Sequence, residues 1–268
     1  MSQQQKPKWA VERERSRRAG PERVWLFGLH AVRDALSNPA RKRHRLIVTK
    51  NAADRLSEAI AAAALTPEIA DARKFTAPLD PGSVHQGAAL EAEALDWGDL
   101  SETARAREDD PAPLIVALDR VTDPHNVGAI LRSAEVFGAR AVIAPRHHAA
   151  PETGALAKAA SGALERQPYL RVRNLGDALG QLAEQGYALI GLEGESDTAL
   201  EAALPPPGVA VCLVLGAEGP GLRARTRTLC HRLARIPAAN AFGSLNVSNA
   251  AAVALYASDA RRRDTAVK

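Results

Sequence analysis

The sequence Ile236-Pro-Ala-Ala-Asn-Ala-Phe-Gly-Ser-Leu-Asn-Val-Ser-Asn249 stands near the end of the chain. It follows a short apolar segment, contains a polar loop with Gly243 and Ser244, and leads into a predicted helix over residues 250–260. Polar side chains on a loop between rigid elements are typical of ligand-binding sites. The same residues also suit a simple helix cap, with Ser244 or Asn246 as the N-cap. Taken alone, this stretch leaves both interpretations open.

Apolar strands and amphipathic helices alternate before this stretch, from residue 114 onward. Leu114–Leu118 and Val209–Leu215 are wholly apolar, as expected of strands buried on both faces of a parallel sheet. The alternation predicts an α/β fold with one doubly wound parallel sheet, whose ligands bind beyond the carboxyl ends of its strands. The predicted strands are 114–118, 141–144, 169–172, 188–192, 209–215 and 233–236, and the predicted helices 126–137, 153–159, 175–185, 223–229 and 250–260.

A smaller α/β unit precedes this sheet. Its predicted strands are 24–27, 46–49 and 88–95, and its helices are one beginning at Gly28 and a second over 52–64. A charged segment that ends in Asp-Asp-Pro-Ala-Pro113 then predicts a linker. The predicted organisation is a disordered basic tail (1–22), a substrate-binding domain (23–95), a linker (96–112) and a catalytic domain (113–262).

Length and composition limit the class of protein. The 268 residues suffice for about two domains. No run approaches the roughly 20 apolar residues of a membrane span, and the polar N-terminus does not look like a secretory signal. The only cysteines, Cys212 and Cys230, lack the spacing of metal ligands, so we expect reduced thiols in a cytoplasmic protein.

The charge distribution points to a polyanionic partner. Residues 1–50 carry 13 Lys and Arg against four Asp and Glu, whereas the whole chain has a net charge of +4. A basic leading segment on a mildly acidic body suggests an arm that meets nucleic acid. A solvated tail without a partner would have the same composition, so charge alone does not decide.

Three polar loops follow apolar strands, and the sheet topology allows them to meet. Loop one is residues 119–126, loop two is residues 216–222 and loop three is residues 236–249. Loop two is rich in glycine, but it has neither the dinucleotide-binding pattern nor a phosphate-binding loop. Nicotinamide and nucleoside triphosphate enzymes are therefore disfavoured.

Several residues near these loops have two interpretations each. Asn126 could simply cap the following helix, and Glu218 could be a surface carboxylate or reach a substrate hydroxyl. Arg132 stands among apolar residues, which indicates an ion pair or a phosphate contact. No Ser/His/Asp set appears, and His147-His148 alone is a weak metal signal, so no metal is predicted.

Three segments together resemble a known family. Asp123–Ala134, Leu215–Leu222 and Ile236–Ser248 match, in order, the three motifs of the SpoU (TrmH) RNA methyltransferases of the SPOUT superfamily. The N-terminal unit, with Phe27-Gly-Leu-His-Ala-Val32 and His85-Gln-Gly87, resembles the ribosomal-protein-L30-like substrate-binding domain found in many of them. The resemblance covers about residues 23–260.

The resemblance implies an S-adenosyl-L-methionine (AdoMet)-dependent methyltransferase that acts on a ribose 2′-hydroxyl in structured RNA. Guanosine in large-subunit rRNA is the favoured target, and tRNA or a non-catalytic role in ribosome assembly are the alternatives. It also implies a C-terminal segment threaded through a deep trefoil knot, although general topological rules disfavour knots. A homodimer is expected, with each active site completed across the interface.

The same resemblance implies roles for individual residues. The catalytic candidates are Asn126, Arg132, Glu218, Ser244 and Asn246. The candidates for cofactor binding are Leu215, Gly216, Gly219, Ile236, Ser244 and Leu245. Because a guanidinium stays protonated, Arg132 is expected to clamp a phosphate and polarise the ribose, and Glu218 or a water to accept the proton. Ala238 and Asn240 replace the Met and Gly common in the family, which puts the shape of the cofactor loop in question.

Overall fold

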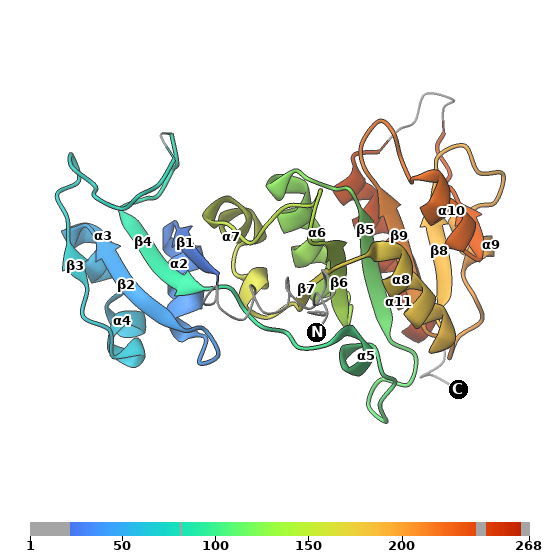
Figure 1. Ribbon diagram of the computed structural model, residues 1–268, viewed down its shortest axis with the longest axis horizontal. Helices are drawn as coiled ribbons and strands as arrows, with labels where there is room; N and C mark the ends of the chain where they lie inside the picture. Colours follow the sequence, from blue (N-terminus) through green and yellow to red (C-terminus); the bar gives the residue numbers. More distant parts are fainter. Residues whose placement is uncertain (1–21, 81, 240–244, 264–268) are drawn as a thin grey trace, which may run out of the picture.

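The computed structural model describes residues 22–80, 82–239 and 245–263, and it contains two separate β-sheets (Figure 1). The predicted basic tail lies outside these residues except for Glu22, as does Ser244 of loop three. An extended segment with one short helix, α5 (Leu100–Thr103), joins the two sheets. Among the described residues, no helix is both long and apolar enough to cross a membrane.

The N-terminal sheet has four strands in the order β1-β4-β2-β3. The central strand β4 pairs antiparallel with both β1 and β2, while β3 adds two parallel residues at the edge. The helix expected over 52–64 is divided at Leu56, whose buried side chain packs in the core. The elements are β1 (Arg23–Phe27), α2 (Leu29–Ser37), β2 (Arg43–Val48), α3 (Lys50–Arg55), α4 (Ser57–Ala63), β3 (Glu68–Ile69) and β4 (Ala88–Glu93).

The C-terminal sheet has six strands in the order β10-β8-β9-β5-β6-β7, and every pairing is parallel. Its strands are β5 (Leu114–Asp119), β6 (Ala141–Pro145), β7 (Tyr169–Val172), β8 (Ala188–Leu192), β9 (Val211–Gly216) and β10 (Arg232–Ala234). Its helices are α6 (Pro124–Val136), α7 (Gly154–Ala160), the 3-10 turn η1 (Ala163–Glu165), α8 (Leu175–Glu184), α9 (Leu200–Ala203), α10 (Ala224–Leu229) and α11 (Val247–Arg263). The predicted parallel sheet is confirmed.

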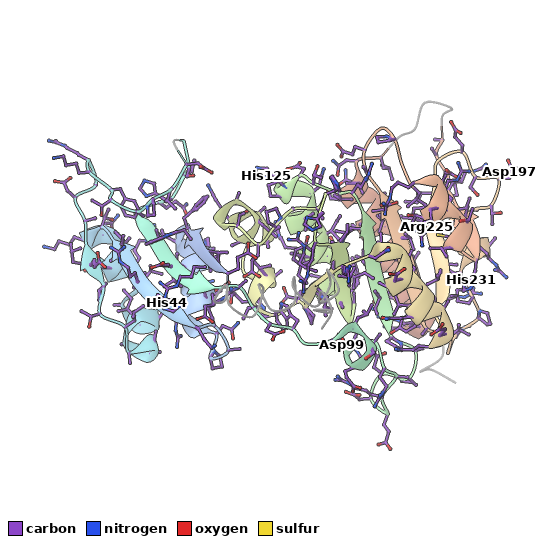
Figure 2. All side chains as sticks on the ribbon, in the orientation of Figure 1. His44, Asp99, His125, Asp197, Arg225 and His231 are labelled. Carbon is purple, nitrogen blue, oxygen red and sulfur yellow. The ribbon has the colours of Figure 1, made fainter. Side chains whose placement is uncertain are left out.

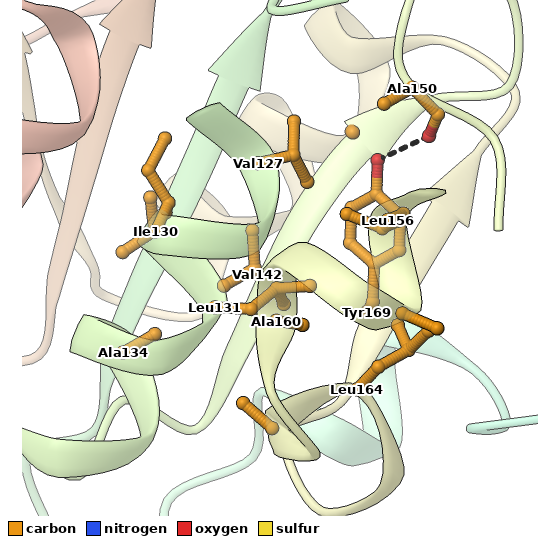
Figure 3. Close-up of a cluster of buried hydrophobic side chains, with 14 of the residues drawn as sticks. Val127, Ile130, Leu131, Ala134, Val142, Ala150, Leu156, Ala160, Leu164 and Tyr169 are labelled. Carbon is orange, nitrogen blue, oxygen red and sulfur yellow. Dashed lines mark hydrogen bonds between the residues drawn. The ribbon is translucent and has the colours of Figure 1, made fainter. Parts of the chain in front are cut away.

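Helices cover both faces of this sheet, which explains the wholly apolar strands. Leu114, Val116 and Leu118 of β5 belong to a core shared with α6, α7 and α11, whereas Ile115 and Ala117 belong to the core under α8. Figure 3 shows the first core, where apolar side chains of α6 and α7 pack over β6 and β7. There the hydroxyl of Tyr169 donates to the carbonyl of Ala150 at 2.8 Å. Burial raises the pKa of Tyr169 to about 12.

The strand order reverses between β5 and β9. The chain runs from β5 through β6 to β7 on one side, and places β8, β9 and β10 on the other. Such a switch point opens a crevice at the carboxyl edge, where ligands of open α/β sheets bind. Because Asp119 pairs in register with Gly216, loops one and two begin side by side at this point.

A buried ion-pair network connects the two units. The guanidinium of Arg41, from the N-terminal unit, has a fully buried side chain and bonds to both carboxylate oxygens of Glu165 at 2.6 and 3.0 Å. It also donates to Glu152 at 2.5 Å and to the carbonyl of Glu93 at 2.7 Å. Its pKa is raised because, although burial disfavours its charge, the bonds and charges of Glu165 and Glu152 outweigh that effect.

Candidate functional site

Loop one leads into α6, and the residue that caps this helix is not Asn126. Asp123, and not Asn126, caps α6: its side chain accepts from the amide of His125 at 2.9 Å, and Pro124 occupies the first helical position. Proline is favoured there because it lacks the amide that would stay unpaired. The interpretation of Asn126 as a helix cap is therefore wrong, and its buried side chain lies in the first turn of α6.

The side chains of Asn126, Glu218 and Asn246 meet in one cluster, one from each loop. The amide nitrogen of Asn126 donates to Oε1 of Glu218 at 3.2 Å. The amide nitrogen of Asn246 donates to Oδ1 of Asn126 at 2.9 Å and also to Oε1 of Glu218. The structure thus brings the three predicted loops together at the switch point of the sheet.

The orientation of Asn246 is set by the start of α11. Its Oδ1 accepts from the backbone amide of Ser248 at 2.8 Å and from the Ser248 hydroxyl at 2.5 Å. The helix begins at Val247, three residues earlier than predicted. Asn246 therefore caps the helix with its oxygen, as one of the two interpretations predicted, and joins the cluster with its nitrogen.

Glu218 is the group in the cluster with spare hydrogen-bonding capacity. Its Oε1 accepts from two amides, and Oε2 has no partner among the described residues. A carboxylate has two acceptor oxygens, each able to accept further hydrogen bonds. The side chain is exposed, so Oε2 is available to a bound hydroxyl.

Loop two is a tight turn that only glycine permits at its start. A Cβ on Gly216 would lie 2.1 Å from the carbonyl carbon of Gly221 and 2.4 Å from the amide of Leu222. The turn is closed by a 2.9 Å bond from the amide of Gly221 to the carbonyl of Ala217. Gly219 has a φ of +80° and open space around its Cα, so backbone there is accessible to a ligand.

An ion pair that the sequence analysis did not predict, between Asp119 and Arg223, fixes the C-terminal end of loop two. The carboxylate of Asp119, fully buried at the end of β5, accepts from Nε of Arg223 at 2.6 Å and from its backbone amide at 3.1 Å. The sequence signal for this buried ion pair is an acidic residue at the end of a wholly apolar strand, because a buried carboxylate needs a charged partner.

Arg132 lies outside this cluster. It is exposed on α6 and has no hydrogen-bond or ion-pair partner within residues 22–80, 82–239 and 245–263. Six positions after Asn126, it points about 120° away around the helix. It shares a face of α6 with Val136, one turn further on.

That face belongs to an apolar patch on α6 and α11, defined by the exposed Val136, Val253 and Tyr256 and by the half-buried Phe137, which directly follows α6. Val136 is 75% exposed and Tyr256 58% exposed, and the rings of Phe137 and Tyr256 meet edge to face at 5.9 Å. Contiguous exposed apolar side chains are typical of surfaces that bind another protein.

The predicted cofactor residues other than Ser244, which lies outside the described residues, are at the same edge of the sheet. Leu215 is buried as the penultimate residue of β9, and Gly216 and Gly219 follow it in the chain. Ile236, half buried, follows β10, and Leu245 is 48% exposed just before α11. No three His, Cys, Asp or Glu side chains in the part of the chain that the structure describes gather as a metal-binding group.

Two family models match the chain. The model described as "SpoU rRNA Methylase family" matches residues 113–256, and the one described as "RNA 2′-O ribose methyltransferase substrate binding" matches residues 25–97. Together these matches span both sheets.

Curated relatives and solved structures agree with these matches. Two proteins named "23S rRNA (guanosine-2′-O-)-methyltransferase RlmB" are similar over 239 residues. The protein from Ralstonia nicotianae is 39% identical, covering 86% of this chain and 93% of its own. The protein from Yersinia pestis is 36% identical, covering 86% and 94%. The SpoU methyltransferase AviRb from Streptomyces viridochromogenes, solved in complex with AdoMet, aligns with a TM-score of 0.75 at 26% identity, covering 94% of each chain.

Proposed function

Because this chain belongs to the SpoU RNA methyltransferase family, we propose that it transfers a methyl group from AdoMet to the ribose 2′-hydroxyl of a guanosine in 23S rRNA. The observation that carries this proposal is the cluster of Asn126, Glu218 and Asn246 at the switch point of the parallel sheet. The similarity to the relatives named as 23S rRNA enzymes extends over 94% and 93% of their length. This favours rRNA over tRNA as the substrate.

In the proposed reaction, Oε2 of Glu218 accepts a hydrogen bond from the 2′-hydroxyl and takes its proton, directly or through a water. Asn126 and Asn246 hold the carboxylate in place through Oε1. Correct placement of reacting groups can supply much of the rate enhancement when bond formation needs an in-line approach. Arg132 binds the adjacent phosphate and polarises the ribose.

The residues around loop two fit AdoMet, which supplies the electrophilic methyl group. The turn at Gly216 and the open space at Gly219 expose main chain to a ligand, and the exposed side chain of Leu245 offers an apolar contact. We propose that Leu215, Gly216, Gly219, Ile236, Ser244 and Leu245 hold the cofactor. We also propose that the C-terminal segment is threaded through the deep trefoil knot of this family.

We also propose that the protein acts as a homodimer through the apolar patch of α6 and α11. Arg132 shares the α6 face of Val136 but points away from its own Asn126, so a partner subunit could receive it in its site. This arrangement explains why an arginine expected in catalysis has no partner among the described residues of one chain.

We propose different roles for the two units, RNA binding for the N-terminal unit and methyl transfer for the C-terminal unit. Residues 23–95, with the tail 1–22, bind RNA, residues 96–112 link the units, and residues 113–262 carry out methyl transfer. The two free thiols, Cys212 and Cys230, suit the reducing cytoplasm proposed as its location.

The test is transfer of labelled methyl groups from AdoMet to unmodified 23S rRNA and, in parallel, to tRNA, followed by nucleoside analysis. We expect 2′-O-methylguanosine in 23S rRNA alone. Labelled tRNA would favour the tRNA alternative. AdoMet binding without transfer to either RNA would require a ribosomal intermediate as substrate, and neither binding nor transfer would favour a non-catalytic assembly factor.

A further inference from the structure

A cavity of about 610 Å³ opens at the carboxyl edge of the large sheet, next to loops one and two. It lies beyond the ends of β5, β6 and β7, and the starts of α8 and α10 close its other side. In Figure 2, Arg225 marks this edge together with His125 of α6, whereas Asp99 lies at the opposite edge. The basic residues in its lining are Arg120, His147, His148, Arg173, Arg223 and Arg225.

Of the four arginines that line this cavity, Arg223 is paired with the buried carboxylate of Asp119, whereas the other three have no strong ionic partner among the residues that the structure describes. Asp177 is the one carboxylate in the lining, and its contact with Arg225 is 4.0 Å long between two well-exposed side chains. Such an exposed pair contributes little. Arg120 and Arg173 have neither a hydrogen-bond nor an ion-pair partner within the described ranges. Like charges gathered in a concave site favour the binding of an anion.

We propose that this basic cavity binds a phosphodiester group of the RNA substrate, close to the nucleotide that is methylated. The inference rests on the proposed function, because it assumes that RNA is the substrate. Guanidinium groups match phosphate oxygens with paired hydrogen bonds, and four of them converge on this cavity. The lining includes none of the cluster residues Asn126, Glu218 and Asn246, so the cavity is a separate site beside the cluster.

The loops that carry these cations are tightly formed. Arg120 and His148 adopt left-handed backbone conformations, with φ of +62° and +59°. Side chains other than glycine rarely adopt this region, and such residues concentrate at functional sites. The bonds from Arg223 to buried Asp119 anchor the start of α10 and so place Arg225. The N-terminus of the ten-residue helix α8 adds a partial positive charge.

The amount of charge favours RNA over the cofactor as the occupant. The anionic group of AdoMet is a single carboxylate, which one arginine can pair. A phosphodiester chain presents successive negative charges along a groove, and this pattern suits arginines that come from three separate segments of the chain. The cavity would therefore hold backbone that flanks the target nucleotide.

The test compares two double variants of the full-length protein. Arg173→Ala with Arg225→Ala removes two cations from the cavity. Arg105→Ala with Arg263→Ala removes two exposed, ion-paired arginines that lie away from it. For each, RNA affinity is measured by filter binding from 50 to 300 mM salt, AdoMet affinity by calorimetry, and methyl transfer by kcat/KM. Arg173→Lys with Arg225→Lys tests whether charge alone suffices.

We expect the cavity variant to bind RNA about tenfold more weakly, with a salt slope reduced by about one to two, while AdoMet affinity stays unchanged. The control should match the wild type, and the lysine variant should recover most of the loss. A wild-type salt slope in the cavity variant would overturn the inference, as would a loss of AdoMet affinity instead. If the wild-type protein binds RNA but does not methylate it, the proposed function is wrong. The RNA affinities of the variants would still show whether the cavity binds RNA.

Discussion

The amide nitrogen of Asn246 donates a 2.9 Å hydrogen bond to Oδ1 of Asn126, although 120 positions separate the two residues in the chain. The contact exists because parallel strands deliver loops one, two and three to the same edge of the sheet. Glu218 completes the cluster and retains one free carboxylate oxygen among the described residues.

Arg132→Ala should abolish methyl transfer while AdoMet affinity stays within a few-fold of wild type, because Arg132 has no hydrogen bond to any cofactor candidate that the structure describes. Mixing Arg132→Ala with Asn246→Ala should then restore activity. Random exchange puts half of the molecules in mixed dimers, each with one intact composite site, so the mixture should reach about a quarter of wild-type activity. No recovery after confirmed subunit exchange would contradict a site shared between subunits.

Gly216→Ala should weaken AdoMet binding at least tenfold, because the added Cβ would lie 2.1 Å from the backbone of Gly221 and force loop two to move. Gly180→Ala is the matched control, since nothing lies within 4 Å of its Cβ position in α8. Calorimetry with AdoMet should separate the two variants. Equal affinities would mean that loop two does not contribute to the cofactor site.

Arg41→Ala should lower the free energy of unfolding by about 3–5 kcal/mol, because it leaves the buried carboxylates of Glu165 and Glu152 unpaired. Arg45→Ala is the control, since its bonds to Glu68 lie between half-exposed side chains and should contribute little to stability. Urea denaturation measures both. Similar effects of the two substitutions would show that the network contributes little.

The cysteines should make stability fall at alkaline pH. Burial raises the pKa of Cys230 to about 12, with repulsion from Asp119 and Glu193 adding to it, and burial raises the pKa of Cys212 well above its usual range. An ordinary thiol ionises near pH 8.5, so above that pH the unfolded chain loses protons that the folded chain keeps. The stabilising contribution is complete below about pH 8.5 and is lost as pH rises towards 12.

Iodoacetamide labelling provides the measurement for these thiols. At pH 8 only about one folded Cys230 in 10⁴ would be a thiolate, because its pKa lies four units higher. Folded protein should therefore remain unlabelled under conditions that label both cysteines in urea. Rapid labelling of the native protein at pH 8 would contradict the protonated state.

Much of the large sheet was predictable because its strands are buried on both faces. The apolar run Val209–Leu215 predicts a strand because β9 lies inside the sheet, where both of its faces are buried. The observed bounds of β9 differ from the prediction by two residues at the start and one at the end. The short elements β3 and α9 were missed, since two and four residues carry too little periodicity and depend on tertiary pairing.

The site was predictable in composition but less so in geometry. The three motifs identified Asn126, Glu218 and Asn246, yet Asn126 was also expected as a helix cap because the start of α6 was placed two residues late. The partnership of Arg41 with Glu165 left no local signal, since 124 positions separate them. The same holds for the basic cavity, whose arginines come from three separate segments of the chain.

The central claim is that methyl transfer takes place at the Asn126, Glu218 and Asn246 cluster, and single-turnover kinetics test it most directly. The measurement is the rate of methyl transfer to 23S rRNA for Glu218→Gln and Asn246→Ala, with AdoMet affinity determined on the same samples. We predict that the rate falls at least 100-fold while the AdoMet Kd changes by less than about threefold, since positioned general bases contribute rate factors of about 10² to 10⁴. Wild-type transfer rates in both variants would contradict the account.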